Sequence, residues 1–175
     1  KVFDNDFDWC DWLVKRMYKF PDTFFIVRFH PRSFSMKRNV KSLDTINKIQ
    51  NLSKTKIANL AFDLPSDNLS VYDYILETDL LLQSASALSF EFGIFGIPSL
   101  TYDRNVFYFN DDLSFYPKNM KDYLNKIKYL LDKKNYKKDK IIVNSFKWLI
   151  LQLNYEYIDI SDVFNPPVKN LIFRA

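Results

Sequence analysis

The chain has 175 residues, a net charge of +4, 47% hydrophobic residues and 18% aromatic residues. This composition favours one folded domain with a substantial core and excludes an intrinsically disordered chain. The single cysteine, Cys10, excludes an intrachain disulfide and a cysteine zinc cluster, and fits a reducing compartment. The apolar runs are shorter than the roughly 20 residues that span a bilayer, so we expect a cytoplasmic location.

The first part of the chain alternates helical and extended patterns. Residues 5–20 have apolar side chains at helical spacing and end at Pro21, which predicts a helix. Residues 24–29 (FFIVRF) predict a central strand, residues 42–52 a helix and residues 56–62 a further strand. Ser70 is a good N-cap for a helix over residues 71–77. Because the chain begins with Lys1 and enters a helical pattern at once, we expect a piece of a longer, two-domain protein.

The middle of the chain predicts a strand, a turn, a helix and a second strand. Residues 79–83 (DLLLQ) form an apolar run without alternation, which is typical of a strand buried on both faces of a parallel sheet. A turn over residues 84–86 and a short helix carrying Glu91 follow, with Gly96 as the helix C-cap and residues 99–102 as the next strand. Residues 118–133 and 140–155 predict two more helices. The alternation predicts an α/β fold with a parallel sheet and helices on both faces.

Two stretches could bind an anion. The turn offers the hydroxyls of Ser84, Ser86 and Ser89 beside a helix N-terminus, at the end of a strand where open α/β sheets hold ligands. The chain's only histidine, His30, follows the first strand, and Arg28 and Arg32 flank it in sequence. An imidazole and guanidinium groups suit a phosphate or pyrophosphate. Taken alone, His30 is better explained by local backbone hydrogen bonds, whereas together with the serine turn it favours a ligand role.

Glu91 and a lysine cluster each leave two interpretations open. The Glu91 carboxylate either forms a buried hydrogen bond or accepts one from a ligand hydroxyl such as that of a ribose. The lysines form either a solvated surface or a basic face that approaches anionic lipid or a negatively charged acceptor. The cluster comprises Lys133, Lys134, Lys137, Lys138 and Lys140. We expect no nucleic-acid partner, because the lysines are not interleaved with aromatics in a recognisable module. We expect no metal, because the sequence has one histidine and one cysteine. We expect no cofactor, and the Walker, Rossmann-fingerprint and GxSxG patterns are missing from the sequence.

Three ordered motifs resemble the C-terminal half of GT-B glycosyltransferases of bacterial capsule and surface-polysaccharide synthesis. The first is R-x-H-P, at Arg28, His30 and Pro31. The second is P-x-D-x-x-S-x-Y, at Pro65, Asp67, Ser70 and Tyr72. The third runs from a strand to G-i-P, at Asp79, Leu80, Leu82, Ser86, Glu91, Gly96, Ile97 and Pro98.

The resemblance implies a Rossmann-like domain that binds a CMP- or UDP-linked sugar donor for transfer to a saccharide or lipid-linked acceptor. It implies that Arg28, His30, Arg32 and the serines contact donor phosphates. It places Glu91, Pro65, Asp67 and Ser70 at the ribose or base.

The family's N-terminal domain, which usually carries the catalytic base, is not in these residues, so the catalytic residues are unknown and the enzyme is expected to be incomplete. Such an enzyme could associate peripherally with the inner face of the cytoplasmic membrane.

The sequence departs from the family's pattern in the turn, which reads Ser-Ala-Ser where a Ser-Ser or Ser-Thr pair is commoner. A similar histidine and serine arrangement also resembles CDP-glycerol-dependent glycerophosphotransferases. A non-catalytic α/β assembly module is the third alternative. Doubly wound sheets host many functions, so the fold alone does not separate them.

Overall fold

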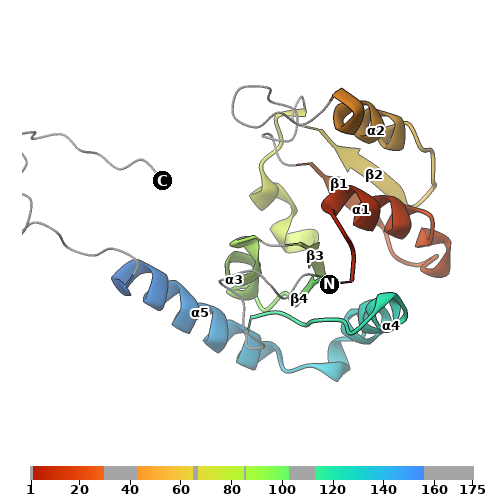
Figure 1. The fold of residues 1–175 in the computed structure, drawn as a ribbon. Helices are drawn as coiled ribbons and strands as arrows, with labels where there is room; N and C mark the ends of the chain where they lie inside the picture. The colour runs from red at the N-terminus through yellow and green to blue at the C-terminus, as the bar shows by residue number, and fades with distance from the viewer. Residues whose placement is uncertain (1, 30–42, 65–66, 85, 103–112, 156–175) are drawn as a thin grey trace, which may run out of the picture.

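Helices and short parallel strands alternate along the chain in a computed structural model that describes residues 2–29, 43–64, 67–84, 86–102 and 113–155 (Figure 1). The α-helices are α1 (Asp6–Val14), α2 (Leu43–Ser53), α3 (Leu88–Gly93), α4 (Met120–Leu131) and α5 (Lys138–Tyr155). The strands are β1 (Phe25–Arg28), β2 (Leu60–Asp63), β3 (Leu81–Gln83) and β4 (Ser99–Thr101). Among the described residues the order also includes the 3-10 helices η1 (Met17–Lys19), η4 (Val71–Glu77) and η5 (Lys133–Asn135).

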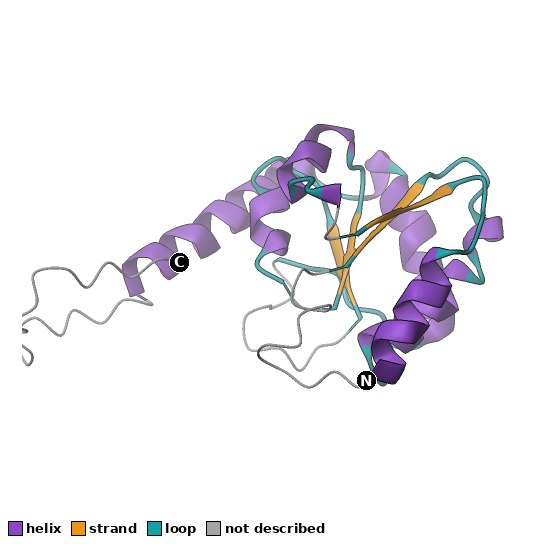
Figure 2. Cartoon of the chain, turned by 90° about the horizontal axis from the view of Figure 1, so that it is seen from above, coloured by secondary structure: helices purple, strands orange, loops and turns teal. Residues whose placement is uncertain are grey.

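The strands form two parallel pairs. β1 pairs with β2, so that Phe25 lies opposite Leu60 and Arg28 opposite Asp63. β3 pairs with β4 in the same sense, and each pair is a separate two-stranded sheet among the described residues. Figure 2 shows the strands in the middle of the molecule with helices on either side. The mixed α/β class and the parallel pairing are therefore confirmed, whereas one continuous sheet is not seen.

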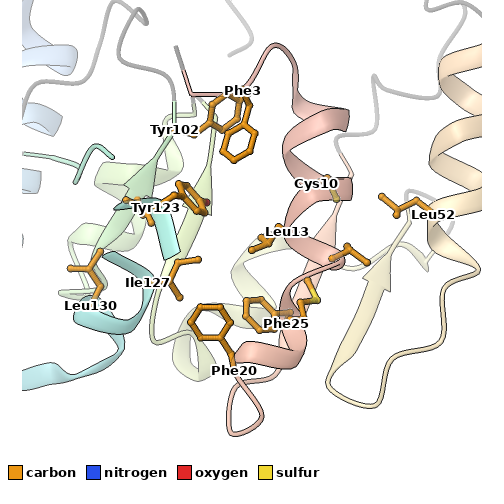
Figure 3. Packing of buried hydrophobic residues seen from close by; sticks show 13 residues of the cluster. Phe3, Cys10, Leu13, Phe20, Phe25, Leu52, Tyr102, Tyr123, Ile127 and Leu130 are labelled. Atoms are coloured by element: carbon orange, nitrogen blue, oxygen red, sulfur yellow. The ribbon is translucent and has the colours of Figure 1, made fainter. Parts of the chain in front are cut away.

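The larger of two buried apolar clusters in the described part of the chain joins the two strand pairs. Phe25 of β1 and Leu100 of β4 belong to the same buried cluster, with Leu13 of α1 and Ile127 of α4 (Figure 3). The indole N–H of Trp9 donates to the buried Tyr123 hydroxyl at 2.9 Å, which ties α1 to α4. Burying these side chains supplies the main driving force for folding. The expected helical face of residues 118–133 is confirmed by this packing.

Local signals explain where several elements begin and end. The Asn5 side chain accepts from the Asp8 backbone N–H and starts α1. Gly96 has a φ of 77°, and its N–H and that of Ile97 donate to the carbonyls of Gly93 and Phe92, which is a Schellman ending for α3. The predicted C-cap role of Gly96 is confirmed.

Two predicted boundaries are wrong for tertiary reasons. The α-helix expected through residue 20 ends at Val14, and the chain continues as η1, in which Met17 is fully buried. The strand expected over residues 56–62 begins at Leu60. The Asn59 amide donates to the carbonyls of Phe20 and Thr23 at 3.0 and 2.8 Å. These hydrogen bonds hold the residues before Leu60 in a non-strand conformation, so β2 begins later than expected.

Four buried hydroxyl residues and one buried glutamine lie beside the second strand pair. They are Ser89, Ser99, Thr101, Ser114 and Gln83, and are called the hydroxyl cluster below. The hydroxyl of Ser114 is 2.9 Å from that of Ser99 and 2.6 Å from that of Thr101. The backbone around Ser114 runs parallel to β4, because the Phe115 N–H donates to Ser99 and the Phe115 carbonyl accepts from Thr101. The cluster thus fixes this segment against the outer edge of β4.

Candidate functional site

A hollow of about 290 Å³ lies at the carboxyl ends of β1 and β2. Parallel strands put their carboxyl ends at one edge, which is the usual ligand position in open α/β sheets. Its lining comes from the end of β1, the end of β2 and the loop that leads to η4. The lining residues are Arg28, Phe29, Asp63, Leu64, Asn68, Leu69 and Ser70.

The Arg28 guanidinium connects the three parts of this hollow. Its Nη1 forms an ion pair with Asp63, and its Nη2 donates to the Leu69 carbonyl at 2.8 Å. Asp63 is buried, with 4% of its surface exposed, so the pair also satisfies a carboxylate that would otherwise be costly to bury. Since both of these donors bond to protein acceptors, Arg28 holds the end of β2 and the loop before η4 together.

Polar side chains hold the described residues between β2 and η4 in place. The Asp67 carboxylate accepts from the Leu64 N–H at 2.8 Å. Asn68 adopts a φ of 53°, a left-handed conformation that asparagine tolerates. Ser70 caps η4 in a capping box with Asp73, whose carboxylate accepts from the Ser70 N–H at 2.7 Å. Asp67 and Ser70 therefore shape the pocket rim.

Tyr72 links this rim to the helix that carries Glu91. The Tyr72 hydroxyl donates to Glu91 Oε2 at 2.8 Å, and this bond, together with the negative charge of Glu91, raises the pKa of Tyr72. Glu91 is partly exposed. The carboxylate thus forms a hydrogen bond within the protein at the surface, not the buried hydrogen bond that was one of the two interpretations, and a ligand contact stays a prediction.

The three serines of the turn lie in different environments. Ser84 and Ser86 are partly exposed, and the Ser86 hydroxyl accepts from the Leu88 N–H at 3.3 Å. Ser89 is 1% exposed and bonds to Gln83 inside the hydroxyl cluster. A ligand at the surface could therefore meet Ser84 and Ser86, whereas Ser89 belongs to the core beneath the turn.

His30, Arg32 and Pro65 lie outside the described residues. His30 follows Phe29, the pocket residue directly after β1. Across the ranges given above, no group of three or more histidine, cysteine, aspartate or glutamate side chains could hold a metal ion. None of the helices seen there is long and apolar enough to cross a membrane.

The sequence reasoning missed Asp63 and Asn68. The buried carboxylate of Asp63 is a weak signal in the sequence, because its partner, Arg28, is 35 residues away. Asn68 had a clearer signal, since it stands in a run of turn-forming residues that includes Asp67 and Ser70.

Comparisons of the chain with protein-family models, curated proteins and solved structures found no match. The fold itself defines the class: an α/β protein with short parallel strand pairs. Among the described residues, the pocket at the carboxyl ends of β1 and β2 lies where such folds usually bind a ligand, and a larger hollow of about 500 Å³ lies beside the start of β2, between Ser53 and Leu64.

Proposed function

We propose that this chain is the donor-binding domain of a glycosyltransferase that uses a nucleotide-activated sugar, CMP- or UDP-linked, in surface polysaccharide synthesis. One observation carries the proposal. The pocket brings together the end of β1 and the loop before η4, two segments in which the sequence resembles separate donor-binding motifs. A chance resemblance would not require the two segments to share one hollow.

In this proposal the pocket holds the nucleoside, and the residues after β1 hold the phosphate. The Arg28 charge is already balanced by Asp63, so the guanidinium orients the loop. His30 and Arg32 supply positive charge and N–H donors to the nucleotide phosphate, which is the leaving group. These donors stabilise the negative charge that develops on the phosphate as its bond to the sugar breaks. Ser84 and Ser86 offer further hydroxyl donors, and Glu91 accepts from a ribose hydroxyl.

The first test is binding of CMP, CDP and UDP, measured by isothermal titration calorimetry. We expect at least one nucleotide to bind and His30→Ala to weaken it tenfold or more, since a charge-assisted hydrogen bond contributes about 1.5–3 kcal/mol. The thermal unfolding midpoint of the variant should stay near that of the parent. Full affinity in His30→Ala would remove this residue from the site.

Glu91→Gln has a matched control in Glu77→Gln, because both are glutamates at the surface and Glu77 is on η4. We expect Glu91→Gln to weaken the binding of ribonucleotides more than the binding of 2′,3′-dideoxynucleotides. Glu77→Gln should leave both affinities unchanged. An equal effect of Glu91→Gln on both kinds of nucleotide would contradict the ribose contact.

A donor panel separates the proposed function from its alternatives. Stabilisation against thermal unfolding by CMP- or UDP-sugars supports the proposal, because a ligand that binds the native state raises the midpoint. Selective stabilisation by CDP-glycerol would assign a glycerophosphotransferase instead. No stabilisation by any nucleotide would leave a non-catalytic assembly module and end the proposal.

A further inference from the structure

The outward face of α5 combines exposed apolar side chains with lysines. Val143, Phe146, Ile150 and Leu151 are 50%, 45%, 53% and 44% exposed, although they are large and apolar. Val143, Phe146 and Ile150 are three and four residues apart, so they lie along one side of the helix, and Leu151 lies at the edge of this row. Single exposed apolar residues are ordinary, but a row of them on one helix indicates a surface that contacts something apolar.

The opposite side of α5 is already occupied by the protein. Ser145 is 1% exposed and lies against Gly93 of α3, so close that a Cβ on the glycine would overlap it. Figure 1 shows α5 running past α3 and away from the strands. The helix therefore has a packed side at Ser145 and an outward side that carries the apolar row.

Positive charge borders the apolar row. Lys140 and Lys147 are exposed on the same outward side of α5, and Lys134, Lys137 and Lys138 are exposed at and before its start. Asp139 is the acidic residue of its first turn. Lysines beside a large apolar face are typical of helices that lie in the plane of a membrane interface and are attracted by anionic lipids.

We propose that the outward face of α5 binds the surface of a bilayer that contains anionic lipid. The apolar row enters the headgroup boundary, and Lys140 and Lys147 contact lipid phosphates. The charge of the surface selects this occupant, because a neutral protein partner would not require the lysines. In this proposal the helix lies in the plane of the bilayer surface. This surface function is independent of nucleotide binding.

The test is co-sedimentation of the 175-residue chain with vesicles made of equal parts phosphatidylcholine and phosphatidylglycerol, without nucleotide. We expect binding at low salt, weaker binding at high salt and little binding to phosphatidylcholine alone. Lys140→Glu with Lys147→Glu should lower the partition coefficient at least about 25-fold, since each lysine near an anionic surface contributes roughly a fivefold factor. Lys54→Glu with Lys56→Glu, on exposed lysines between α2 and β2, is the charge-matched control and should have a smaller effect.

The apolar contribution has its own pair of variants. Phe146→Ser with Ile150→Ser should lower partitioning on the order of tenfold, because each side chain loses apolar area that the membrane would bury. Tyr18→Ser with Leu76→Ser is a stringent control, since these side chains are 73% and 87% exposed. Equal losses in test and control variants would overturn the proposal. Sedimentation velocity without lipid provides a second test. A concentration-dependent dimer that is abolished by Phe146→Ser with Ile150→Ser would also overturn the proposal, because the face would then bind a second copy of the chain.

Discussion

The contact between α3 and α5 makes Gly93 a sharp test of the packing. A Cβ at Gly93 would lie 3.1 Å from the Ser145 Cβ and closer still to its hydroxyl oxygen. Ser145 is 1% exposed in the middle of α5, so neither its side chain nor the helix can move aside easily. Gly93→Ala therefore forces two packed helices apart.

The expected size follows from two opposing effects. Adding a methyl group to a packed interior costs about 1–3 kcal/mol. Alanine is favoured over glycine in a helix by up to about 1 kcal/mol, and less here because Gly93 is the last residue of α3. We expect Gly93→Ala to lower the free energy of unfolding by about 1–2 kcal/mol, or the melting temperature by about 2–4 °C per kcal/mol.

A double-mutant cycle with Ser145→Gly tests the cause. Removing the Ser145 side chain opens the space that the new methyl group needs, although a glycine within α5 itself costs about 0.5–1 kcal/mol. In that background Gly93→Ala should be neutral or stabilising, which gives a coupling energy of about 1–3 kcal/mol in urea unfolding. Equal destabilisation by Gly93→Ala in both backgrounds would refute the packing argument.

Three further predictions concern stability and reactivity. Arg28→Ala should lower the free energy of unfolding by about 2–3 kcal/mol in urea titrations, because it leaves the buried Asp63 carboxylate without its ion-pair partner. This value is reduced from that of a fully buried pair because Arg28 is partly exposed. Adding Asp63→Asn should restore part of the loss, because the buried charge is then removed. Ser70→Ala should cost about 0.5–2 kcal/mol by removing the N-cap of η4, whereas Ser70→Asp should retain most of the stability. Burial, and to a smaller extent the negative charge of Asp11, raises the pKa of the Cys10 thiol to about 12. The native thiol should therefore resist alkylation at pH 8 until urea unfolds the chain. Above pH 9.0 the unfolded thiol loses its proton while the native one keeps it, and the free energy of unfolding should fall from there to about pH 12.

The sequence predicted most elements because their signals are local. The apolar period of residues 118–133, the Ser70 cap and the Gly96 ending each depend on neighbours within a few residues, and all three are seen. The segment over residues 71–77 was expected to be helical and is a 3-10 helix, since local signals do not choose between helix types. Where Asn59 reaches back to Phe20 and Thr23, the boundary depends on a distant contact and the prediction failed.

The candidate site was predictable only in outline. Its position at the carboxyl ends of strands follows from the α/β alternation. The Arg28–Asp63 pair and the Tyr72–Glu91 bond join residues that the sequence separates by 35 and 19 positions, so no local pattern reveals them. Both Arg28 and Glu91 were expected to contact a ligand, and the structure gives each a protein partner first.

The buried hydroxyl cluster beside β4 constrains how this sequence can change. Ser99 and Thr101 each share a contact with Ser114, and Thr101 also accepts from the Gln83 amide at 3.1 Å. Replacing one hydroxyl by an apolar group leaves another buried polar atom with too few partners, which is costly. These positions should therefore change together or not at all, and a homologue that replaces Thr101 with valine should carry compensating apolar residues at Ser114 and Gln83.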